Sequence, residues 1–225
     1  MKTRVNIIVN SFSEKTPTEL ADKYLNDCDI SFSTYMPLNP AEYQIIILWN
    51  LTKIIKDLPD TSNVVVFHSS DLPKGRGWAP IYYAIANTEP RHVITAILAS
   101  EEVDSGNIIC KASFPILNSY CADDLRKIDE TVCFLMANRI INKFKGKKIT
   151  GKPQLGTPTY NKRRYPSDSK VDINQPLTNL LPHIKACSSE NPAYFEISEN
   201  RFEIIVKSAS TYPIIPLDLE INFEK

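Results

Sequence analysis

The sequence predicts an α/β protein built on a doubly wound, mostly parallel sheet, with a short C-terminal appendage. Apolar runs rich in β-branched residues recur in the first half of the chain, at 5–9, 29–33, 44–49, 64–67, 92–98 and 107–111. Polar or turn-forming residues bound each run, which is typical of buried strands. Segments with helical spacing separate several of the runs, and this alternation is the pattern of a parallel sheet.

Four segments predict helices in this domain. The longest is 123–144, whose apolar residues recur along one side. The segment 78–86 has the same spacing and a proline near its start, where the first turn of a helix tolerates it. Shorter helices are expected at 18–25 and 51–58. In a sheet covered by such helices, ligands bind at the carboxyl ends of the strands.

The character of the chain changes near residue 146. A polar stretch at 146–172 holds Gly, Pro, Lys and Arg and predicts an extended loop. It is followed by a predicted short helix and two strands joined by a turn, at 177–184, 194–197 and 201–206. We therefore expect a main domain at 1–150 and an extension of loop, helix and hairpin at 151–225. The exposed strand edges of the hairpin also suggest a homodimer.

Composition excludes several classes of protein. Lys plus Arg and Asp plus Glu both number 26, so the chain lacks the basic excess of a nucleic-acid binder. The five cysteines are odd in number, are widely spaced and form no CxxC pair, which predicts free thiols without a disulfide framework or metal site. The chain opens directly into a strand-like run, and no run reaches about 18 apolar residues. We expect a cytoplasmic protein with no membrane segment, no metal and no nucleic-acid partner.

Two polar blocks follow predicted strands and carry the functional signal. The first, HSSDLPKGRG at 68–77, begins directly after the run VVVF, and the second is EVDSGNII at 102–109. Together with QLGTPTY at 154–160, they resemble the N10-formyltetrahydrofolate-dependent formyltransferases, which carry H-x-S-x-L-P-x-x-R-G, D-[TS]-G-x-I and Q-x-G-x-x-T-Y. The resemblance covers roughly residues 40–205. It implies a Rossmann-like formyltransferase catalytic domain at 1–150 and N10-formyltetrahydrofolate as the co-substrate.

The chemistry of formyl transfer explains the residue types in both blocks. The attacking amine loses a proton and the leaving nitrogen gains one, around a tetrahedral oxyanion. Histidine is the side chain best suited to carry such a proton at neutral pH, and a carboxylate beside it supports the imidazole. By resemblance, His68 is the catalytic histidine and Asp104 is its partner.

The sequence departs from the family pattern at one position. The family usually has an Asn two residues before the His, where it polarises the formyl oxygen, and this chain has Val66 there. Loss of one oxyanion donor typically costs on the order of 10²–10³ in rate. Asn50 is a candidate replacement, because it follows the neighbouring strand. The imidazolium with a backbone N–H is a second explanation, and a weakened or non-catalytic relative is a third.

The resemblance also implies contacts to the folate and to the amine acceptor. For the folate we expect Trp49, Leu51, Ser70, Leu72 and Val103, with a plain core role as the alternative for Trp49. For the acceptor we expect Arg76, Trp78, Lys162, Arg163 and Arg164, because arginine forks suit a diphosphate. The alternatives are a solvated loop for the basic cluster at 162–164 and a loop-organising role for Arg76.

The substrate class is the least determined prediction. The short extension and the zero net charge favour a small acceptor over tRNA. The RGW that ends the first block is similar to enzymes acting on 4-amino-4,6-dideoxy sugars carried on nucleotides, including those of nonulosonic (pseudaminic-like) acid or surface-polysaccharide pathways. We therefore expect a nucleotide-linked amino sugar. The alternatives are another amine such as an aminoacyl group, hydrolysis of the folate, and a relative that binds folate or sugar without turnover.

Overall fold

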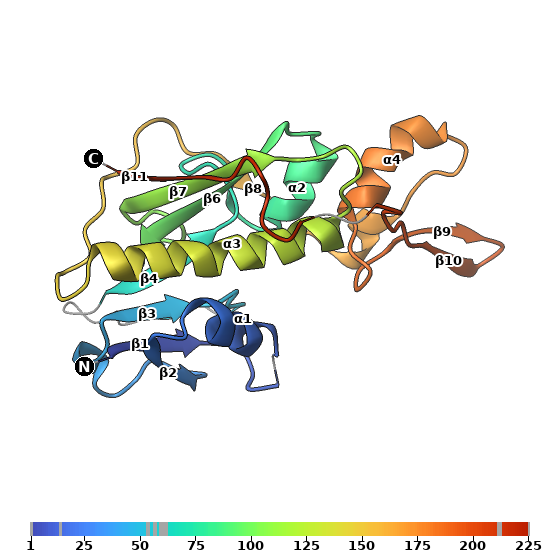
Figure 1. Cartoon of the computed structure of the whole chain (residues 1–225). Coiled ribbons are helices and arrows are strands. Elements are labelled where there is room, and N and C mark those ends of the chain that lie inside the picture. The colour runs from blue at the N-terminus through green and yellow to red at the C-terminus, as the bar shows by residue number, and fades with distance from the viewer. Residues whose placement is uncertain are drawn as a thin grey trace.

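A computed structural model of the chain describes residues 2–13, 15–52, 55, 58, 63–210 and 213–224. Its centre is a seven-stranded sheet, shown with its helices in Figure 1. The strands lie in the order β11 (Glu220–Phe223), β7 (Ile108–Pro115), β6 (Arg91–Leu98), β4 (Val64–His68), β3 (Ile45–Leu48), β1 (Thr3–Ile8), β2 (Cys28–Ser33). The α/β class predicted from the sequence is confirmed.

The sheet is mixed, with a parallel half and an antiparallel half. β2, β1, β3 and β4 pair in parallel, as their continuous apolar runs predicted. β6 pairs antiparallel with β4 and β7, and β11 pairs antiparallel with β7. Only residues 99–107 join β6 to β7, which is shorter than the dozen or so residues that a parallel crossover needs.

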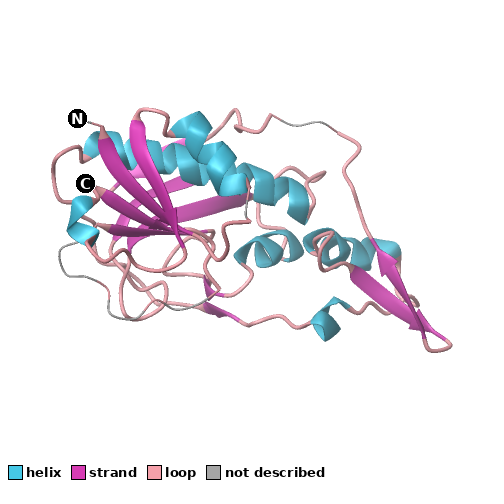
Figure 2. Ribbon diagram, turned by 90° about the horizontal axis from the view of Figure 1, so that it is seen from below, coloured by secondary structure: helices cyan, strands magenta, loops and turns pink. Residues whose placement is uncertain are grey.

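Two helices cover one face of the sheet. α1 (Thr16–Tyr24) and α3 (Ala122–Lys143) contact each other, and α3 also contacts β6 and β7. Figure 1 shows α3 running along the whole sheet, and Figure 2 shows the strands fanned beneath the helices. The core between them holds the inward side chains of the strands, such as Val5, Ile47 and Val65, and the buried stripe of α3. This amphipathic packing explains the apolar spacing in the sequence.

The opposite face of the sheet is covered by loops that carry the functional motifs. Ile8, Ile46 and Val64 pack there with Leu51, Ile55 and Leu58. The helix predicted at 51–58 falls mostly outside the described residues. Further along the same face, Leu72 packs on Ile97 and Ile108. The first motif is thus anchored directly on the sheet.

The C-terminal part forms an appendage that projects from the sheet (Figures 1 and 2). Its elements are β8 (Tyr160–Asn161), η2 (Pro166–Ser169), α4 (Leu177–Ala186), β9 (Ala193–Ile197) and β10 (Asn200–Ile204); η1 (Pro40–Glu42) lies in the main domain. The predicted helix and hairpin are confirmed. The extended loop contains two elements that the sequence did not predict, β8 and η2. β8 pairs with β5 (Arg76–Gly77), and α4 contacts α2 (Pro80–Ala86).

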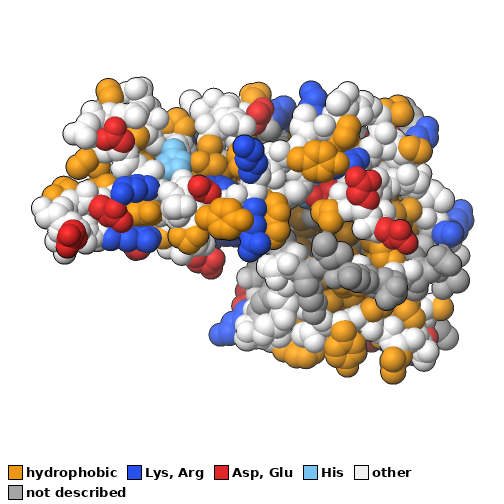
Figure 3. All heavy atoms as spheres, turned by 180° about the vertical axis from the view of Figure 1, so that it is seen from behind, with side chains coloured by type: hydrophobic (Ala, Val, Ile, Leu, Met, Phe, Trp, Pro, Cys, Tyr) orange, Lys and Arg blue, Asp and Glu red, His pale blue; other side chains and the backbone are white. Residues whose placement is uncertain are grey.

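The end of the chain returns to the main sheet as β11, which the sequence did not predict. The domain boundary at 150 stays a prediction. All five cysteines are free thiols, as expected. No helix among the described residues is long and apolar enough to cross a membrane. On the face seen in Figure 3, acidic and basic side chains are interspersed.

Candidate active site

His68 is the last residue of β4, at the carboxyl end of the parallel half of the sheet. Its neighbour across the ladder is Thr95 of β6, a fully buried residue. The Thr95 hydroxyl donates to the carbonyl of Ser70 at 2.7 Å and so fixes the turn that leaves the strand. The sheet therefore sets the position of the His68 backbone, and a buried hydroxyl sets the start of the loop.

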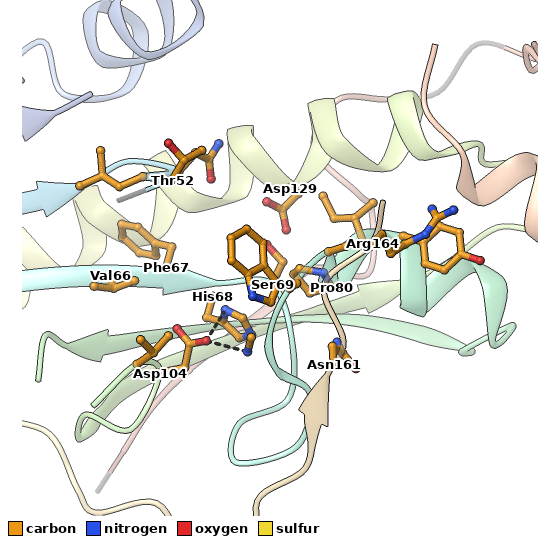
Figure 4. Close-up of a pocket in the computed structure, with 18 of the residues that line it drawn as sticks. Thr52, Val66, Phe67, His68, Ser69, Pro80, Asp104, Asp129, Asn161 and Arg164 are labelled. Carbon is orange, nitrogen blue, oxygen red and sulfur yellow. Dashed lines mark hydrogen bonds and ion pairs between the residues drawn. The ribbon is translucent and has the colours of Figure 1, made fainter. Parts of the chain in front are cut away.

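The side chains of His68 and Asp104 lie together, as the sequence predicted. His68 Nδ1 is 3.5 Å from Asp104 Oδ2, and the two side chains are only 9% and 10% exposed. His68 Nε2 is 2.9 Å from the carbonyl oxygen of Gly75. In the tautomer that donates from Nε2 to this carbonyl, Nδ1 faces the carboxylate. Figure 4 shows Asp104 pointing at the imidazole. Contacts on both nitrogens fix the orientation of the ring.

Asp104 is held by the backbone around it. Its φ is +55°, and its Oδ2 accepts a hydrogen bond of 2.8 Å from the N–H of Gly77. Two residues on, Gly106 lies so close to the sheet that a Cβ there would be 1.7 Å from the carbonyl oxygen of Leu98. Only glycine fits at that position. The glycine of the D-S-G motif thus brings the Asp104 turn onto the end of β6.

Gln154 links the two motifs. Its Nε2 donates to the carbonyls of Asp104 at 2.7 Å and Gly106 at 2.9 Å. Its Oε1 accepts from Arg76 Nη2 at 2.8 Å. Arg76 is 8% exposed and also reaches the Tyr160 hydroxyl at 3.2 Å. Arg76 therefore organises the loops, which was the alternative to a substrate contact.

One cavity of about 900 Å³ runs past this pair. Figure 4 shows Thr52, Val66 and Phe67 toward one end, Arg164 toward the other, and His68 and Ser69 between them. The first end is apolar, lined by Leu48, Leu51, Ile55, Leu58, Val66, Ile97 and Ala99. The second end is polar, lined by residues that include Arg126, Asp129, Glu130, Arg164, Ser169, Ser188 and Asn191. An apolar body with a few polar groups at one end is typical of a small-molecule site.

Five more of the predicted site residues line this cavity: Asn50, Leu51, Trp78, Val103 and Arg164. Asn50 follows β3 in a left-handed conformation, with φ of +45°, and its own carbonyl accepts from Asn10 at 2.9 Å. Val103 and Trp78 are about half exposed, at 49% and 46%. These residues come from four separate segments, and the folded chain brings them to one space.

The other predicted contacts lie elsewhere. Trp49 is buried in the core, with its ring 4.8 Å from that of Phe134, and Leu72 is fully buried beneath the loop. The side chain of Trp49 alternates with those of the cavity-lining Leu48 and Asn50, so it faces the other way, while Leu72 packs on Ile97 and Ile108. The Ser70 hydroxyl donates to the carbonyl of Lys74 at 2.8 Å and closes the loop on itself. None of these three is among the residues that line the cavity.

The basic cluster divides into three different environments. Arg164 lies over the ring of Tyr82, 3.4 Å from its centroid, and lines the cavity. The exposed Arg163 lies 4.6 Å over the ring of Trp78. Lys162 is exposed, and its carbonyl accepts from the Tyr83 hydroxyl at 3.1 Å. Only Arg164 of the three lines the cavity, while Arg163 covers the outer face of a residue that does.

Several polar residues of the cavity were missed by sequence reasoning, and Asn161 and Asp129 are two of them. Asn161, on β8, lines the cavity, and its Nδ2 is 3.4 Å from the same Gly75 carbonyl that His68 contacts. Asp129, on α3, lines the polar end and pairs with the buried His92 at 2.7 Å. Asn161 directly follows the motif QLGTPTY at 154–160, and this position was the signal that could have marked it as a site residue. Asp129 is an acidic residue in an otherwise apolar stripe of α3, an anomaly that could have marked it.

Comparison with known proteins supports the predicted family resemblance. A model of the family described as formyl transferase matches residues 38–132, which include His68 and Asp104. The resemblance to formyltransferases predicted from the sequence is confirmed over these residues. The methionyl-tRNA formyltransferase of Thermodesulfovibrio yellowstonii is 29% identical over 170 residues, covering 75% of this chain and 54% of that protein. The chain thus spans about half the length of the curated relatives it matches.

Solved structures share the fold of this chain at low sequence identity. HypX from Aquifex aeolicus, solved with tetrahydrofolic acid, has a TM-score of 0.75 at 16% identity, over 92% of this chain and 38% of that one. A 4-N formyltransferase from Francisella tularensis has a TM-score of 0.72 at 14% identity, over 93% and 99% of the two chains. Among the described residues of this chain, no group of three or more His, Cys, Asp and Glu is arranged to hold a metal ion.

Proposed function

We propose that this chain transfers a formyl group from N10-formyltetrahydrofolate to the amine of a nucleotide-linked amino sugar. The observation that carries the proposal is the His68–Asp104 pair beside a single cavity with one apolar and one polar end. Two substrates that meet at a proton-carrying residue need such a continuous space. The family match and the tetrahydrofolate-bound relative support the donor.

The apolar end of the cavity fits a flat heterocycle. Leu51 lies there within a cluster of apolar side chains that includes Leu48 and Ala99. Val66 and Val103 line the same space. When bound, the folate supplies the formyl carbon and the leaving nitrogen. Burial of its ring against these side chains excludes water from the reacting atoms, which strengthens every electrostatic contact there.

His68 is proposed as the proton carrier. The amine must lose a proton as it bonds to the formyl carbon, and the leaving nitrogen must gain one. With Nε2 held on the Gly75 carbonyl, Nδ1 is the nitrogen free to exchange a proton, directly or through one water. Asp104 lies 3.5 Å from that nitrogen and stabilises the imidazolium when it forms. Its own position is set by the Gly77 N–H.

Two amides are candidates for the donor to the developing oxyanion in place of the missing family Asn, and we propose Asn161. Asn50, the candidate from the sequence, and Asn161 both line the cavity. A correctly placed amide donor is worth on the order of 10²–10³ in rate. Asn161 is the stronger candidate, because its Nδ2 and His68 Nε2 approach the same carbonyl oxygen.

The polar end is proposed to hold the acceptor. Arg164 offers a guanidinium to an anionic group, and Trp78 offers a half-exposed ring to a base or sugar face. A sugar N-formyltransferase from Shewanella, which shares the fold with a TM-score of 0.63 at 15% identity, supports an amino sugar. The matched methionyl-tRNA formyltransferases support an aminoacyl group as the second candidate. A homodimer through the β9–β10 hairpin, absence of nucleic acid from the substrates and a cytoplasmic location stay predictions.

The test is a formylation assay with variants. The protein is incubated with N10-formyltetrahydrofolate and a panel of nucleotide-linked amino sugars, with methionyl-tRNA as a separate arm. Tetrahydrofolate release and a gain of one formyl mass are measured together. We expect one amino sugar to be formylated, and His68→Ala and Asp104→Asn to lower kcat at least about 100-fold, as for loss of a general acid–base.

The control variant is Leu155→Ala, since Leu155 is 85% exposed and lies outside the cavity. It should keep the activity of the parent chain. Formate release without any acceptor would replace the proposal with a folate hydrolase. Formylation of methionyl-tRNA alone would replace the sugar with an aminoacyl acceptor. Folate binding without turnover on any arm would identify a non-catalytic relative.

A further inference from the structure

A cluster outside the proposed catalytic pair surrounds the thiol of Cys187. Cys187 follows the last residue of α4, and His183 lies one turn earlier on the same helix. Residues four apart share a helix face, and His183 Nε2 is 3.9 Å from the Cys187 Sγ. The thiol is half-buried. A cysteine and a histidine at this separation are the basic unit of a reactive thiol.

Tyr82 contacts the ring nitrogen of His183 that lies away from the cysteine. The Tyr82 hydroxyl is 2.7 Å from His183 Nδ1. Burial raises the pKa of Tyr82, and the protonated hydroxyl can donate to Nδ1. The histidine hydrogen is then on Nε2, directed at the sulfur. Tyr82, His183 and Cys187 thus form a chain of three side chains from two packed helices.

Arg164 and Ser169 complete the surroundings of the thiol. The Ser169 Oγ is 3.7 Å from the sulfur, and Arg164 Nη2 is 3.9 Å from it. Arg164 Nη2 also donates to Ser169 Oγ at 3.1 Å. The nearby Asp168 carboxylate is directed elsewhere, to the N–H of Tyr165. The groups around the sulfur are therefore one fixed cation, a histidine ring nitrogen and a serine hydroxyl that accepts from the thiol.

The sum of these contacts distinguishes Cys187 from the other four cysteines. Burial alone would raise the pKa of the Cys187 thiol, but its hydrogen bonds with His183 and Ser169, and the nearby Arg164, outweigh burial and lower the pKa. Burial raises the pKa of Cys28, Cys121 and Cys133, and that of Cys110 to about 12. The thiolate is the nucleophilic form of cysteine, so the reactive one is at position 187.

We propose that Cys187 is an electrophile-reactive modification site whose thiolate is oxidised to sulfenic acid by hydrogen peroxide. The sulfur attacks one peroxide oxygen, an S–O bond forms and the O–O bond breaks. The leaving oxygen departs as hydroxide and becomes water on protonation. Sulfur loses two electrons and the peroxide gains them. Arg164 and Ser169 then face the new oxygen, and a charge-assisted bond from the guanidinium stabilises it as a sulfenate.

The position of this site links it to the cavity. The two chain neighbours of Cys187, Ala186 and Ser188, both line the cavity, as do Arg164, Tyr82 and Ser169. An oxygen added to the sulfur therefore engages the same arginine that faces the polar end. Oxidation of Cys187 therefore changes the charge at the polar end of the cavity. The reactivity of the thiol itself does not depend on formyl transfer, so its test is separate from the assay for the proposed function.

The first experiment measures alkylation of the intact protein by iodoacetamide between pH 5.5 and 9.5, with the sites identified by peptide mass spectrometry. Cys28 is the internal control, because it too is half-buried but its thiol pKa is raised. At pH 7 we expect Cys187 to react at least about fivefold faster than Cys28, with its pH midpoint below the ordinary cysteine value. Equal rates at the two positions would overturn the proposal.

Two variants test whether Cys187 is reactive because of its neighbouring side chains and not because of its exposure alone. Tyr82→Phe keeps the ring beneath Arg164 but removes the proton donated to His183, and should move the Cys187 midpoint to higher pH. His183→Asn should move it further. If the midpoint stays unchanged in both variants, the histidine does not activate the thiol. Melting temperatures report whether each variant is folded, and the ratio to Cys28 within one sample corrects for partial unfolding.

The second experiment adds hydrogen peroxide and traps sulfenic acid with dimedone. We expect one dimedone adduct, on the peptide that contains Cys187, and its absence in Cys187→Ser. Adducts spread over several cysteines, or none at all, would exclude a selective oxidation site.

Discussion

At the scale of single residues, the carbonyl oxygen of Gly75 organises the candidate site. It accepts from His68 Nε2 at 2.9 Å and lies 3.4 Å from Asn161 Nδ2. The longer contact is at the limit of a hydrogen bond, so the Asn161 amide gives up little by turning to a better acceptor. An oxyanion is a better acceptor, because charge-assisted hydrogen bonds are shorter and stronger than neutral ones.

This argument predicts different effects for the two amides. Asn161→Ala should lower kcat by on the order of 10²-fold or more and leave KM for the folate nearly unchanged, since an oxyanion forms only in the transition state. Asn50→Ala should change kcat less than about fivefold. Steady-state kinetics of both variants with the acceptor found in the assay measure this. The reverse order of effects would assign the donor to Asn50.

The sequence predicted the pairing of His68 with Asp104 because each follows a recognisable strand within a motif. Trp49 and Leu72, expected at the folate, do not line the cavity: Trp49 points to the opposite face of the strand from Leu48 and Asn50, and Leu72 packs on the sheet beneath the loop. A run that is apolar at every position gives no signal of which face is inward. Asn161 was missed because its place depends on a two-residue pairing between β5 and β8, 84 residues apart in sequence.

At the scale of elements, the loop at 152–161 acts as a strap over both motifs. Thr159 Oγ1 accepts from the Gly75 N–H at 2.8 Å, and the Thr159 carbonyl accepts from the Arg76 N–H at 2.9 Å. Gln154 holds the Asp104 turn. The strap therefore adds contacts from a distant part of the chain to the local hydrogen bonds that close the loop at 68–77.

Replacement of Gln154 tests the strap. Gln154→Glu keeps an oxygen for Arg76 but turns the donor toward the Asp104 and Gly106 carbonyls into an acceptor, which repels both. We expect kcat to fall by on the order of 10-fold or more, because small displacements of catalytic groups are costly. Leu155→Ala is the matched control on the same loop. A change in KM alone would mean that the strap contacts substrate and does not position Asp104.

Helices and strands were predicted most accurately where the local sequence pattern is strongest. Strands β1, β3 and β4 were predicted within about two residues because their apolar runs are continuous and bounded. The direction of β6 was not predictable from its own residues, because strand direction depends on the connection and not on composition. β11 is four residues long, and only two of them, Ile221 and Phe223, are apolar, so it gave no run that stood out.

At the scale of the whole molecule, the chain leaves the sheet after α3, builds the appendage and comes back as β11. Ile221 and Phe223 pack on the main core, and Phe223 lies near Phe144 with Lys143 over its ring. β11 also pairs with β7, the strand whose Lys111 holds the Leu72 carbonyl of the catalytic loop at 2.7 Å. The end of the chain therefore covers an edge that would otherwise expose unpaired backbone groups.

The packing of β11 on the core predicts different changes in the free energy of unfolding for substitutions at two neighbouring residues of this strand. Ile221 faces the core side of the sheet, while Asn222 faces the other side and is exposed. Ile221→Asp puts a charge against apolar side chains and should lower the free energy of unfolding by about 2–3 kcal/mol. Asn222→Ala should change it by less than about 0.5 kcal/mol. Urea unfolding followed by circular dichroism measures both, with the slope in denaturant checked for constancy. Equal effects would mean that β11 does not pair in this register, whereas the expected difference would show that the end of the chain stabilises the sheet that carries the site.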